Sequence, residues 1–434
     1  MKKRICFPIV LFVLFALVTG CMEEALPQKI RTVTLSYWTY DEMYKDYMEK
    51  CVNVYNTRTE TKIQLKTAIY SADELDYKLW SSLQSGVGTP DLVDLEQSRF
   101  GRYMNPKNNY LTPLNSVLTP KIEQLDNRSY SKYKSKGFYY GIDYYANNCV
   151  VFYNMDLLKA AEIDPAGIKT FDDYLMAGKK LKENIDMPMI AVDYTDDVLF
   201  EILLTAAGSG YCASDGSLQI NSETNTGILQ LLYDMIHTSK IAVNAPTGEY
   251  FSYEFLNYFN NGKVASIIAP FWYAGYIEKY MPALKGKIHV AGLPAWGQKY
   301  NSGVRISGVA TAVPIQSENP IIAKNLLRDT RLSLENCLAG FEDLFADPIV
   351  PATYKDERLP DLARQKQLFA NNCWSVLKEE YTGAKTPVLG PSYYNAVNKI
   401  TSGALFQVLK ENTLSPKDAL TQAQDEIIKE DNPL

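Results

Sequence analysis

Residues 33–95 alternate between the patterns of strands and helices, and this alternation most limits what the chain can fold into. Residues 33–38 and 63–69 alternate apolar and polar side chains, as half-buried strands do. Residues 42–55 and 73–84 repeat apolar side chains at helical spacing, and residues 92–95 form a short buried run. This strand–helix order predicts a parallel sheet covered by helices, and so an α/β fold.

The carboxyl ends of these strands locate a first group of candidate ligand contacts. Trp38 and Asp41 follow the first strand, and Glu96 and Arg99 follow the third. Ligands on parallel sheets gather beyond the carboxyl ends of the strands, so we expect these four side chains on one rim. Glu96 and Arg99 are three residues apart and could instead pair with each other on the surface.

Residues 137–154 interrupt the alternation and predict a crossing between two lobes. Gly141-Ile142-Asp143 is typical of a turn, and residues 149–153 form an apolar run expected in a strand buried on both faces. Asp143 and Tyr145 would then lie near a cleft between the lobes. The alternative is an ordinary loop inside one large domain.

Strand and helix patterns resume after this crossing. Pro294 ends a further strand pattern at 288–293 and suggests a second crossing, because a strand at 307–313 and a helix at 320–332 resemble a return to the first lobe. The predicted division is a first lobe of residues 31–139 plus 295–331 and a second lobe of residues 140–294 plus 332–434.

Length and composition narrow the classes of function. At 434 residues the chain predicts two or three domains. The formal charge is −6, which argues against nucleic acid as a partner. There are 31 Tyr but only two His, and this favours an aromatic stacking surface over a metal site or histidine-based catalysis. We expect no cofactor and no metal.

The first 21 residues predict an extracytoplasmic lipoprotein. Lys2-Lys3-Arg4 precedes an apolar run at 5–18, as in a secretory signal peptide. Leu17-Val18-Thr19-Gly20-Cys21 resembles the lipobox of bacterial lipoproteins. We therefore expect a signal peptide at 1–20, lipidation of Cys21, and a tether at 21–30 that anchors the protein to the outer face of the cell membrane. The alternative is a plain cleavable signal with an incidental cysteine.

The remaining five cysteines indicate neither a zinc site nor a regular disulfide framework. Their number is odd, their spacings are wide, and no CxxC occurs. Most are expected to be small buried side chains, and whether any of them pair stays open.

Several motifs, in this order, resemble the family 1 extracellular solute-binding proteins of ABC importers, particularly the maltose and oligosaccharide branch. The segments that carry the resemblance are 79–91 (LWSSLQSGVGTPD), 99–103 (RFGRY), 140–143 (YGID), 151–156 (VFYNMD), 261–272 (NGKVASIIAPFW) and 391–397 (PSYYNAV). Asp143 replaces the proline usual in that family. The match spans nearly the whole chain after Cys21.

This resemblance implies a two-lobed periplasmic-binding-protein-like fold (type II) that closes on a ligand by hinge motion. It implies a monomer that captures a carbohydrate by aromatic stacking and polar contacts and delivers it to a membrane permease, without catalysis. The candidates carried over are Trp272 as a stacking residue and Tyr393 or Tyr394 as a C-terminal aromatic pair. Arg305, beside a later strand, is a further candidate.

Other readings of the same residues remain open. Trp272 follows a buried run and could belong to the core, and one ring of Tyr393 and Tyr394 could face inward. Asp196-Asp197 resembles any acidic surface and is set aside. A thiaminase-like enzyme would explain Cys149 near the crossing, but Asn147 occupies the expected position of the nucleophile. Polyamines or a ferric ion are alternative ligands for the same fold.

Overall fold

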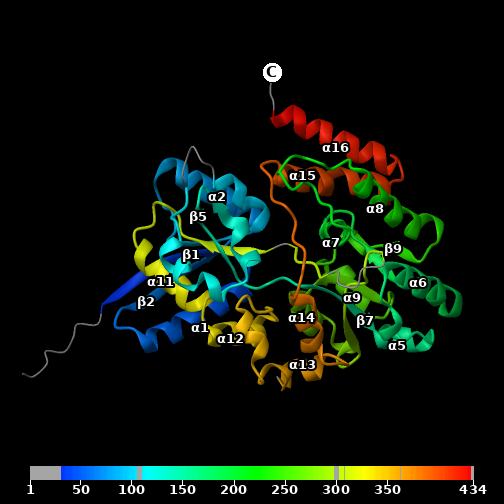
Figure 1. The fold of residues 1–434 in the computed structure, drawn as a ribbon, viewed down its shortest axis with the longest axis horizontal. Helices are drawn as coiled ribbons and strands as arrows, with labels where there is room; N and C mark the ends of the chain where they lie inside the picture. Colours follow the sequence, from blue (N-terminus) through cyan, green and yellow to red (C-terminus); the bar gives the residue numbers. More distant parts are fainter. Residues whose placement is uncertain (1–30, 105–109, 298–302, 307, 362, 432–434) are drawn as a thin grey trace, which may run out of the picture.

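The computed structural model describes residues 31–104, 110–297, 303–306, 308–361 and 363–431. The predicted signal peptide, Cys21 and the tether 21–30 lie outside these residues. No helix in the described ranges is long and apolar enough to cross a membrane. Two lobes lie side by side, one containing α1, α2 and α11 and the other containing α5–α9, α15 and α16 (Figure 1).

The first lobe is built on a five-stranded sheet in the order β2-β1-β3-β12-β6. Its strands are β1 (Thr32–Thr39), β2 (Lys62–Ile69), β3 (Leu92–Glu96), β6 (Ile142–Asp143) and β12 (Val309–Ala312). β1 pairs parallel with β2 and β3, which confirms the alternation predicted for residues 33–95. β12 runs antiparallel to both β3 and β6.

Helices cover this sheet, and their ends follow local sequence signals. Asp41 caps the first of them by accepting the Met43 N–H at 2.7 Å, and Gly86 ends the second at a φ of 73°. The helices are α1 (Glu42–Arg58), α2 (Ala72–Ser85), α3 (Phe100–Tyr103), α4 (Asn115–Leu118), α11 (Pro320–Arg331) and α12 (Leu334–Leu344). A two-stranded hairpin, β4 (Lys134–Ser135) with β5 (Phe138–Tyr139), adds to this lobe.

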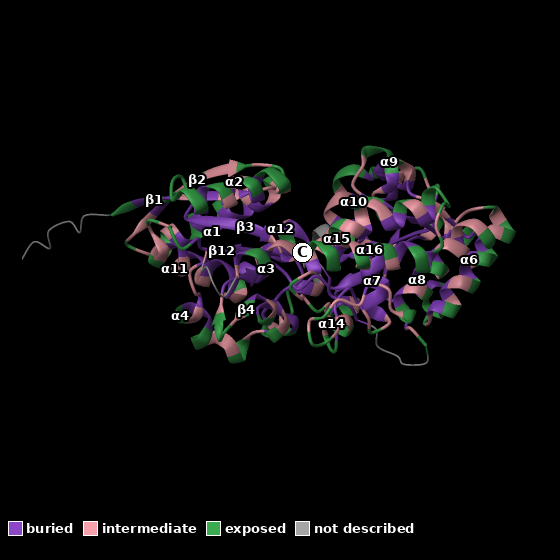
Figure 2. Cartoon of the chain, turned by 90° about the horizontal axis from the view of Figure 1, so that it is seen from above, coloured by how far each residue is buried: buried purple, intermediate pink, exposed green. Residues whose placement is uncertain are grey.

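The second lobe is built on a sheet in the order β11-β7-β10-β8-β9. Every residue of β7 is buried, as its continuous apolar run predicts, and β7 pairs antiparallel with β10 and β11. The strands are β7 (Cys149–Asn154), β8 (Ile190–Val192), β9 (Ala242–Asn244), β10 (Ser266–Pro270) and β11 (Ile288–Gly292). Figure 2 shows the strands at the centre of each lobe mostly buried between helices.

Ten helices complete the described part of the second lobe. They are α5 (Met155–Ala160), α6 (Phe171–Ile185), α7 (Val198–Ala206), α8 (Glu223–Tyr233), α9 (Tyr253–Asn260), α10 (Ala274–Tyr280), α13 (Ala363–Leu368), α14 (Cys373–Tyr381), α15 (Tyr393–Lys399) and α16 (Pro416–Asp431). α15 continues through two π-helical segments to Lys410, and α16 packs against α8 and α15.

The chain crosses between the lobes three times, at positions that differ from the predicted division. β6 belongs to the first sheet, so the first crossing lies at 144–148 and not before residue 140. Val304 and Ile306 pack in the core of the second lobe, so the return lies after residue 304 and not at 295. α12 packs on α1 and α11, so the last crossing follows residue 344 and not 331. Each shift depends on pairing with distant segments, which local patterns do not encode.

The three crossings are hydrogen-bonded to one another. The Asp347 carboxylate accepts the backbone N–H groups of Asn147 at 2.9 Å and Asn148 at 2.8 Å. The Asn148 side-chain oxygen accepts the Arg305 Nε–H at 2.9 Å. Arg305 donates further to Asp126 at 2.5 Å. These buried polar groups tie the crossings into a single hinge network.

Candidate ligand-binding site

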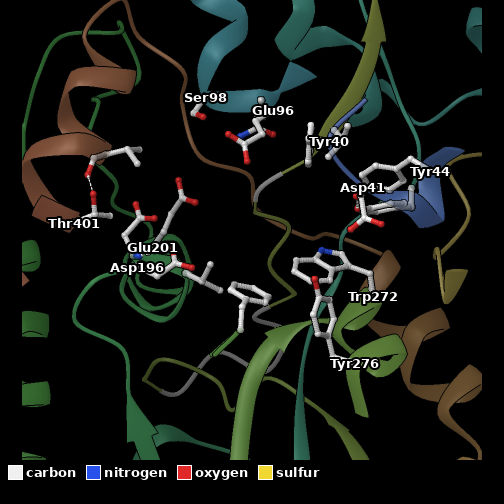
Figure 3. Close-up of a pocket in the computed structure, with 18 of the residues that line it drawn as sticks. Tyr40, Asp41, Tyr44, Glu96, Ser98, Asp196, Glu201, Trp272, Tyr276 and Thr401 are labelled. Carbon is white, nitrogen blue, oxygen red and sulfur yellow. Dashed lines mark hydrogen bonds between the residues drawn. The ribbon is translucent and has the colours of Figure 1, made fainter. Parts of the chain in front are cut away.

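A cavity of about 470 Å³ lies between the two lobes (Figure 3). Both lobes contribute to its wall, which is rich in aromatic and carboxyl side chains. The lining residues are Tyr40, Asp41, Met43, Tyr44, Glu96, Gln97, Ser98, Tyr145, Gly308, Val309 and Leu344 from the first lobe and the crossings, and Asp196, Asp197, Val198, Glu201, Phe251, Trp272, Tyr276, Tyr393, Val397 and Thr401 from the second.

Trp272 forms the aromatic side of this cavity. It lies in the tight turn 271–273 that joins β10 to α10, where Phe271 and Tyr273 point into the core and Trp272 remains half-buried. The Trp272 ring stacks on Phe251 with centroids 5.9 Å apart and planes at 14°. Tyr276, one turn into α10, packs against it edge to face at 6.1 Å. The ring is therefore held rigidly by aromatic neighbours while it lines the cavity.

Tyrosines of the first lobe lie next to this ring, because Trp272 packs against the cluster that contains Tyr44 and Tyr145. Tyr40 precedes α1, Tyr44 lies in its first turn, and Tyr145 lies in the first crossing. The hydroxyls of Tyr44 and Tyr145 are hydrogen-bonded to each other. This contact connects the start of α1 to the crossing segment, so the position of these rings depends on the hinge.

Carboxyl groups at the start of α7 form another side of the cavity. Tyr211 donates its hydroxyl to Asp197 at 2.7 Å, and Tyr393 donates its hydroxyl to Glu201. Burial, followed by the charges of Glu201 and Asp196, raises the pKa of Asp197 well above its usual range. Burial raises the pKa of Glu201 to about 7, against the hydrogen bond from Tyr393. This side therefore holds acceptors that ionise reluctantly.

Two carboxyl groups come from the rim predicted at the carboxyl ends of the first-lobe strands. Asp41 follows β1, and its pKa is raised by burial in spite of its cap to Met43. Glu96 ends β3 and accepts the Arg99 Nε–H at 2.8 Å. The predicted pairing of Glu96 with Arg99 thus exists, and Glu96 still lines the cavity.

The structure gathers half of the predicted site residues around the cavity. Those that line it are Asp41, Glu96, Tyr145, Trp272 and Tyr393. Arg99 and Tyr394 do not line it but meet beside it, with the Arg99 guanidinium 5.6 Å from the centre of the Tyr394 ring. Of the adjacent tyrosines, Tyr393 is the buried ring, as the sequence allowed, yet this same ring reaches the cavity.

Three predicted site residues are placed elsewhere, which corrects the prediction. Trp38 packs edge to face on Tyr70 at 5.4 Å and does not line the cavity. Asp143 is buried in an ion pair with Lys132 at 2.8 Å. Arg305 is 4% exposed and belongs to the hinge network through Asp126. A buried charge needs a partner, so Asp143 and Arg305 are occupied by structure and not by ligand.

Sequence reasoning missed several lining residues. In the sequence Asp196 and Asp197 resemble an ordinary acidic surface, but they follow β8 and so lie beyond the carboxyl end of a strand. The rule that located Glu96 would have found them. Phe251 and Tyr276 carried no comparable signal, because their position depends on how α9 and α10 pack.

Cys149 does not support a catalytic site. It is fully buried in β7, its Sγ–H donates to the Asn147 carbonyl at 3.7 Å, and burial raises the pKa of its thiol well above the usual value. It does not line the cavity. The five described cysteines are free and buried. Within the described ranges, no group of three His, Cys, Asp or Glu side chains is arranged to hold a metal ion.

Comparison with known proteins assigns the family. The sequence model of the bacterial extracellular solute-binding proteins matches residues 38–328. The chain belongs to this family. This solute-binding protein is 31% identical to an arabinooligosaccharide-binding protein of Bacillus subtilis. The alignment covers 98% of the present chain and 99% of the Bacillus protein. A protein of the same name from Halalkalibacterium halodurans is 30% identical over 91% of the chain and 88% of its own length.

Solved structures of other proteins share the fold of this solute-binding protein. The GacH receptor of Streptomyces glaucescens, solved unliganded and with acarbose, has a TM-score of 0.75 at 17% identity, covering 92% of this chain and 98% of its own. The substrate-binding protein Lmo0181 of Listeria monocytogenes, solved with cycloalternan, has a TM-score of 0.74 at 18% identity, covering 92% and 99%. These likenesses confirm the two-lobed α/β fold.

Proposed function

We propose that this solute-binding protein captures an oligosaccharide in the cavity between its lobes and delivers it to the permease of an ABC importer. The observation that carries the proposal is the pairing of one rigid aromatic face, Trp272, with carboxyl groups from both lobes. Sugar rings present apolar C–H faces and hydroxyl donors, and this lining offers a stacking surface and acceptors for them. The role is binding and transfer, without catalysis.

The size of the cavity and the relatives support an oligosaccharide ligand. A volume of about 470 Å³ lies in the range of small-ligand sites. Two relatives that align over most of this chain are named as arabinooligosaccharide-binding proteins. Arabino-oligosaccharides are therefore the first ligands to test.

Isothermal titration of the chain from residue 22 onward tests this function, because this segment retains every described residue. We expect arabinotriose or another neutral oligosaccharide, such as maltotriose, to bind with a dissociation constant of about 1 μM or below. This corresponds to a binding free energy of about −8 kcal/mol or more negative. The proposal would be contradicted if no neutral sugar bound while thiamine or ferric citrate did.

A polyamine is the second candidate ligand, because the lining of the cavity is both acidic and aromatic. Five carboxyl groups and several aromatic rings face the cavity, and such surroundings bind organic cations as well as sugars. Spermidine belongs in the same titration. Binding of spermidine without any sugar would replace the carbohydrate proposal by this one.

We also propose that Cys21 carries the lipid that anchors the protein to the outer face of the bacterial membrane. The basic start, the apolar run and the residues before Cys21 support this anchor. Cells expressing Cys21→Ala should release the protein and fail to incorporate labelled palmitate into it. Cys6→Ala, within the predicted signal peptide, should keep the label, and retention of label in Cys21→Ala would contradict the anchor.

A further inference from the structure

The titratable side chains that line the cavity are all acids. Among the lining residues that the structure describes there are five carboxyl groups and no Lys, Arg or His. Hydroxyl groups of a neutral sugar can donate to such carboxyls, and one carboxylate can accept from two neighbouring hydroxyls. A negatively charged ligand group would find no cation to pair with on this wall.

Three cations close to the cavity already face acidic groups. Arg99 donates to Glu96 at 2.8 Å and Asp73 at 2.6 Å. Lys132 pairs with Asp143 at 2.8 Å. Burial raises the pKa of Asp41 on the rim, and the charge of Lys279, exposed on α10, offsets a small part of this rise. Arg99 and Lys279 act on the first-lobe side of the cavity. Lys132 also acts on the second-lobe side, since burial raises the pKa of Glu201 and the charge of Lys132 lowers it by a smaller amount.

The carboxyl groups of the second lobe have no such partners. In the described part of the chain, no ion pair involves Asp196, Asp197 or Glu201. Their contacts are the Tyr211 and Tyr393 hydroxyls and the backbone N–H of Asp197, which donates to Asp196 at 2.7 Å. Figure 3 shows Asp196 and Glu201 together at one side of the cavity, apart from the aromatic side. We call these three residues the α7 carboxyl wall.

We propose that the α7 carboxyl wall is a charge filter that admits uncharged oligosaccharides and rejects sugars that carry a carboxylate. This inference rests on the proposed function and narrows its ligand class. A carboxylate that enters the cavity loses its water and meets no basic side chain among the lining residues. At pH 8, above the pKa of about 7 to which burial raises Glu201, the wall also carries negative charge and repels the carboxylate. Specificity then comes from an unfavourable interaction with the wrong ligand, in addition to the contacts with the right one.

Two derivatives of one sugar isolate the effect of charge. Reduction of arabinotriose gives its alditol, and oxidation of the same end gives its aldonic acid. Both have an open terminal unit, and only the second is negative at pH 8. We expect the aldonate to bind roughly 100-fold more weakly than the alditol, as repulsion between unit charges a few ångströms apart predicts. Equal affinity would overturn the filter.

Variants of the wall assign the discrimination to its residues. Asp196→Asn/Glu201→Gln should reduce the ratio of the two dissociation constants at least about tenfold. Asp196→Asn alone, at the half-buried member of the wall, should reduce it in the same direction and guards against misfolding of the double variant. Asp172→Asn, an exposed carboxyl on α6, is the matched control and should keep the full ratio. An unchanged ratio in folded wall variants would overturn the assignment.

The parent sugar separates failure of the filter from failure of the function. If arabinotriose and other neutral oligosaccharides do not bind the unmodified protein, the proposed function fails and the filter with it. If they bind, and the aldonate binds as tightly as the alditol, only the filter fails.

Discussion

Single side chains in the cavity are held by contacts that leave one face or one atom for a ligand. The Trp272 ring stacks on Phe251, and Glu201 accepts a hydrogen bond from the Tyr393 hydroxyl. Such support limits the rotamers that these side chains can adopt before a ligand binds, which lowers the entropy cost of binding. Substitutions at these positions should therefore act on affinity and on protonation.

Trp272→Ala should weaken binding of a neutral oligosaccharide about 10- to 100-fold, because it removes the stacking face of the cavity. Isothermal titration measures the change. Tyr253→Ala is the matched control, since Tyr253 is a highly exposed aromatic residue of the same lobe at the start of α9. Unchanged affinity in Trp272→Ala would show that the ring is only structural.

Glu201→Gln should change how stability depends on pH. Burial raises the pKa of Glu201 to about 7 from an ordinary value of 4.5, so the folded protein holds a proton that the unfolded chain releases. The free energy of unfolding therefore falls as the pH rises from the ordinary pKa of 4.5 through the folded-state pKa of about 7. Removing the carboxyl should raise the free energy of unfolding at pH 8, relative to that at pH 5, by about 2 kcal/mol.

Urea denaturation of Glu201→Gln and the unmodified protein at both pH values measures this difference. Neutralising Glu201 also relieves Asp197, whose pKa is raised by burial and by the Glu201 charge. The exposed Glu254→Gln is the control. A difference that is the same at pH 5 and pH 8 would contradict the prediction.

At the scale of secondary-structure elements, a small set of buried polar groups connects the segments that cross between the lobes. Arg305 joins the second crossing to the first through Asn148 and to the first lobe through Asp126. Burial alone would raise the pKa of Asp126, but hydrogen bonds from Arg128 and Arg305 outweigh it and lower the pKa to about 2. The segments that cross between the lobes are thus fixed by charge-assisted contacts and not by apolar packing alone.

Arg305→Met should lower the free energy of unfolding by about 3 kcal/mol, because it breaks a buried ion pair and leaves Asp126 and Asn148 short of a donor. Denaturation by urea at pH 7 measures the loss. Arg358→Met removes the exposed pair with Asp356 and should have a much smaller effect, because solvent screens an exposed ion pair. Equal effects of the two substitutions would refute the structural role of Arg305.

At the scale of the whole molecule, the two lobes touch beside the cavity as well as at the hinge. The turn 97–99 at the end of β3 faces α15, and the Arg99 guanidinium lies over the Tyr394 ring. Arg99 is held by Glu96, Asp73 and Asp76, so it offers a fixed cation to the opposite lobe. This contact favours a closed arrangement of the lobes.

Tyr394→Ala should therefore shift the ligand-free protein toward a more open arrangement. Small-angle X-ray scattering should show a larger radius of gyration without ligand and an unchanged one at saturating ligand. Affinity should fall about 3- to 10-fold, the cost of closing without this contact. Tyr77→Ala, at an exposed ring of α2, is the control. An unchanged radius with unchanged affinity would contradict this role.

Local patterns predicted those parts of the site that follow strands. The sequence predicts Asp41 and Glu96 because they follow β1 and β3, and Trp272 because a family motif ends at it. Asp143 and Arg305 were misplaced because a charged residue near a crossing can serve a ligand or a hinge, and only its partners distinguish the two. Lys132 and Asp126, their partners, are distant in sequence or carried no signal of pairing.

The sequence by itself determined the alternation of strands and helices, the two sheets, the family and the aromatic, acidic character of the chain, because these depend on periodicity, composition and ordered motifs. Only the tertiary structure decided where the chain crosses between lobes and which charges face the cavity. Strand β6 joins the first sheet through β12, some 170 residues away, and the α7 carboxyl wall faces Trp272 through the packing of separate helices. Long-range pairing of this kind leaves no local trace in the sequence.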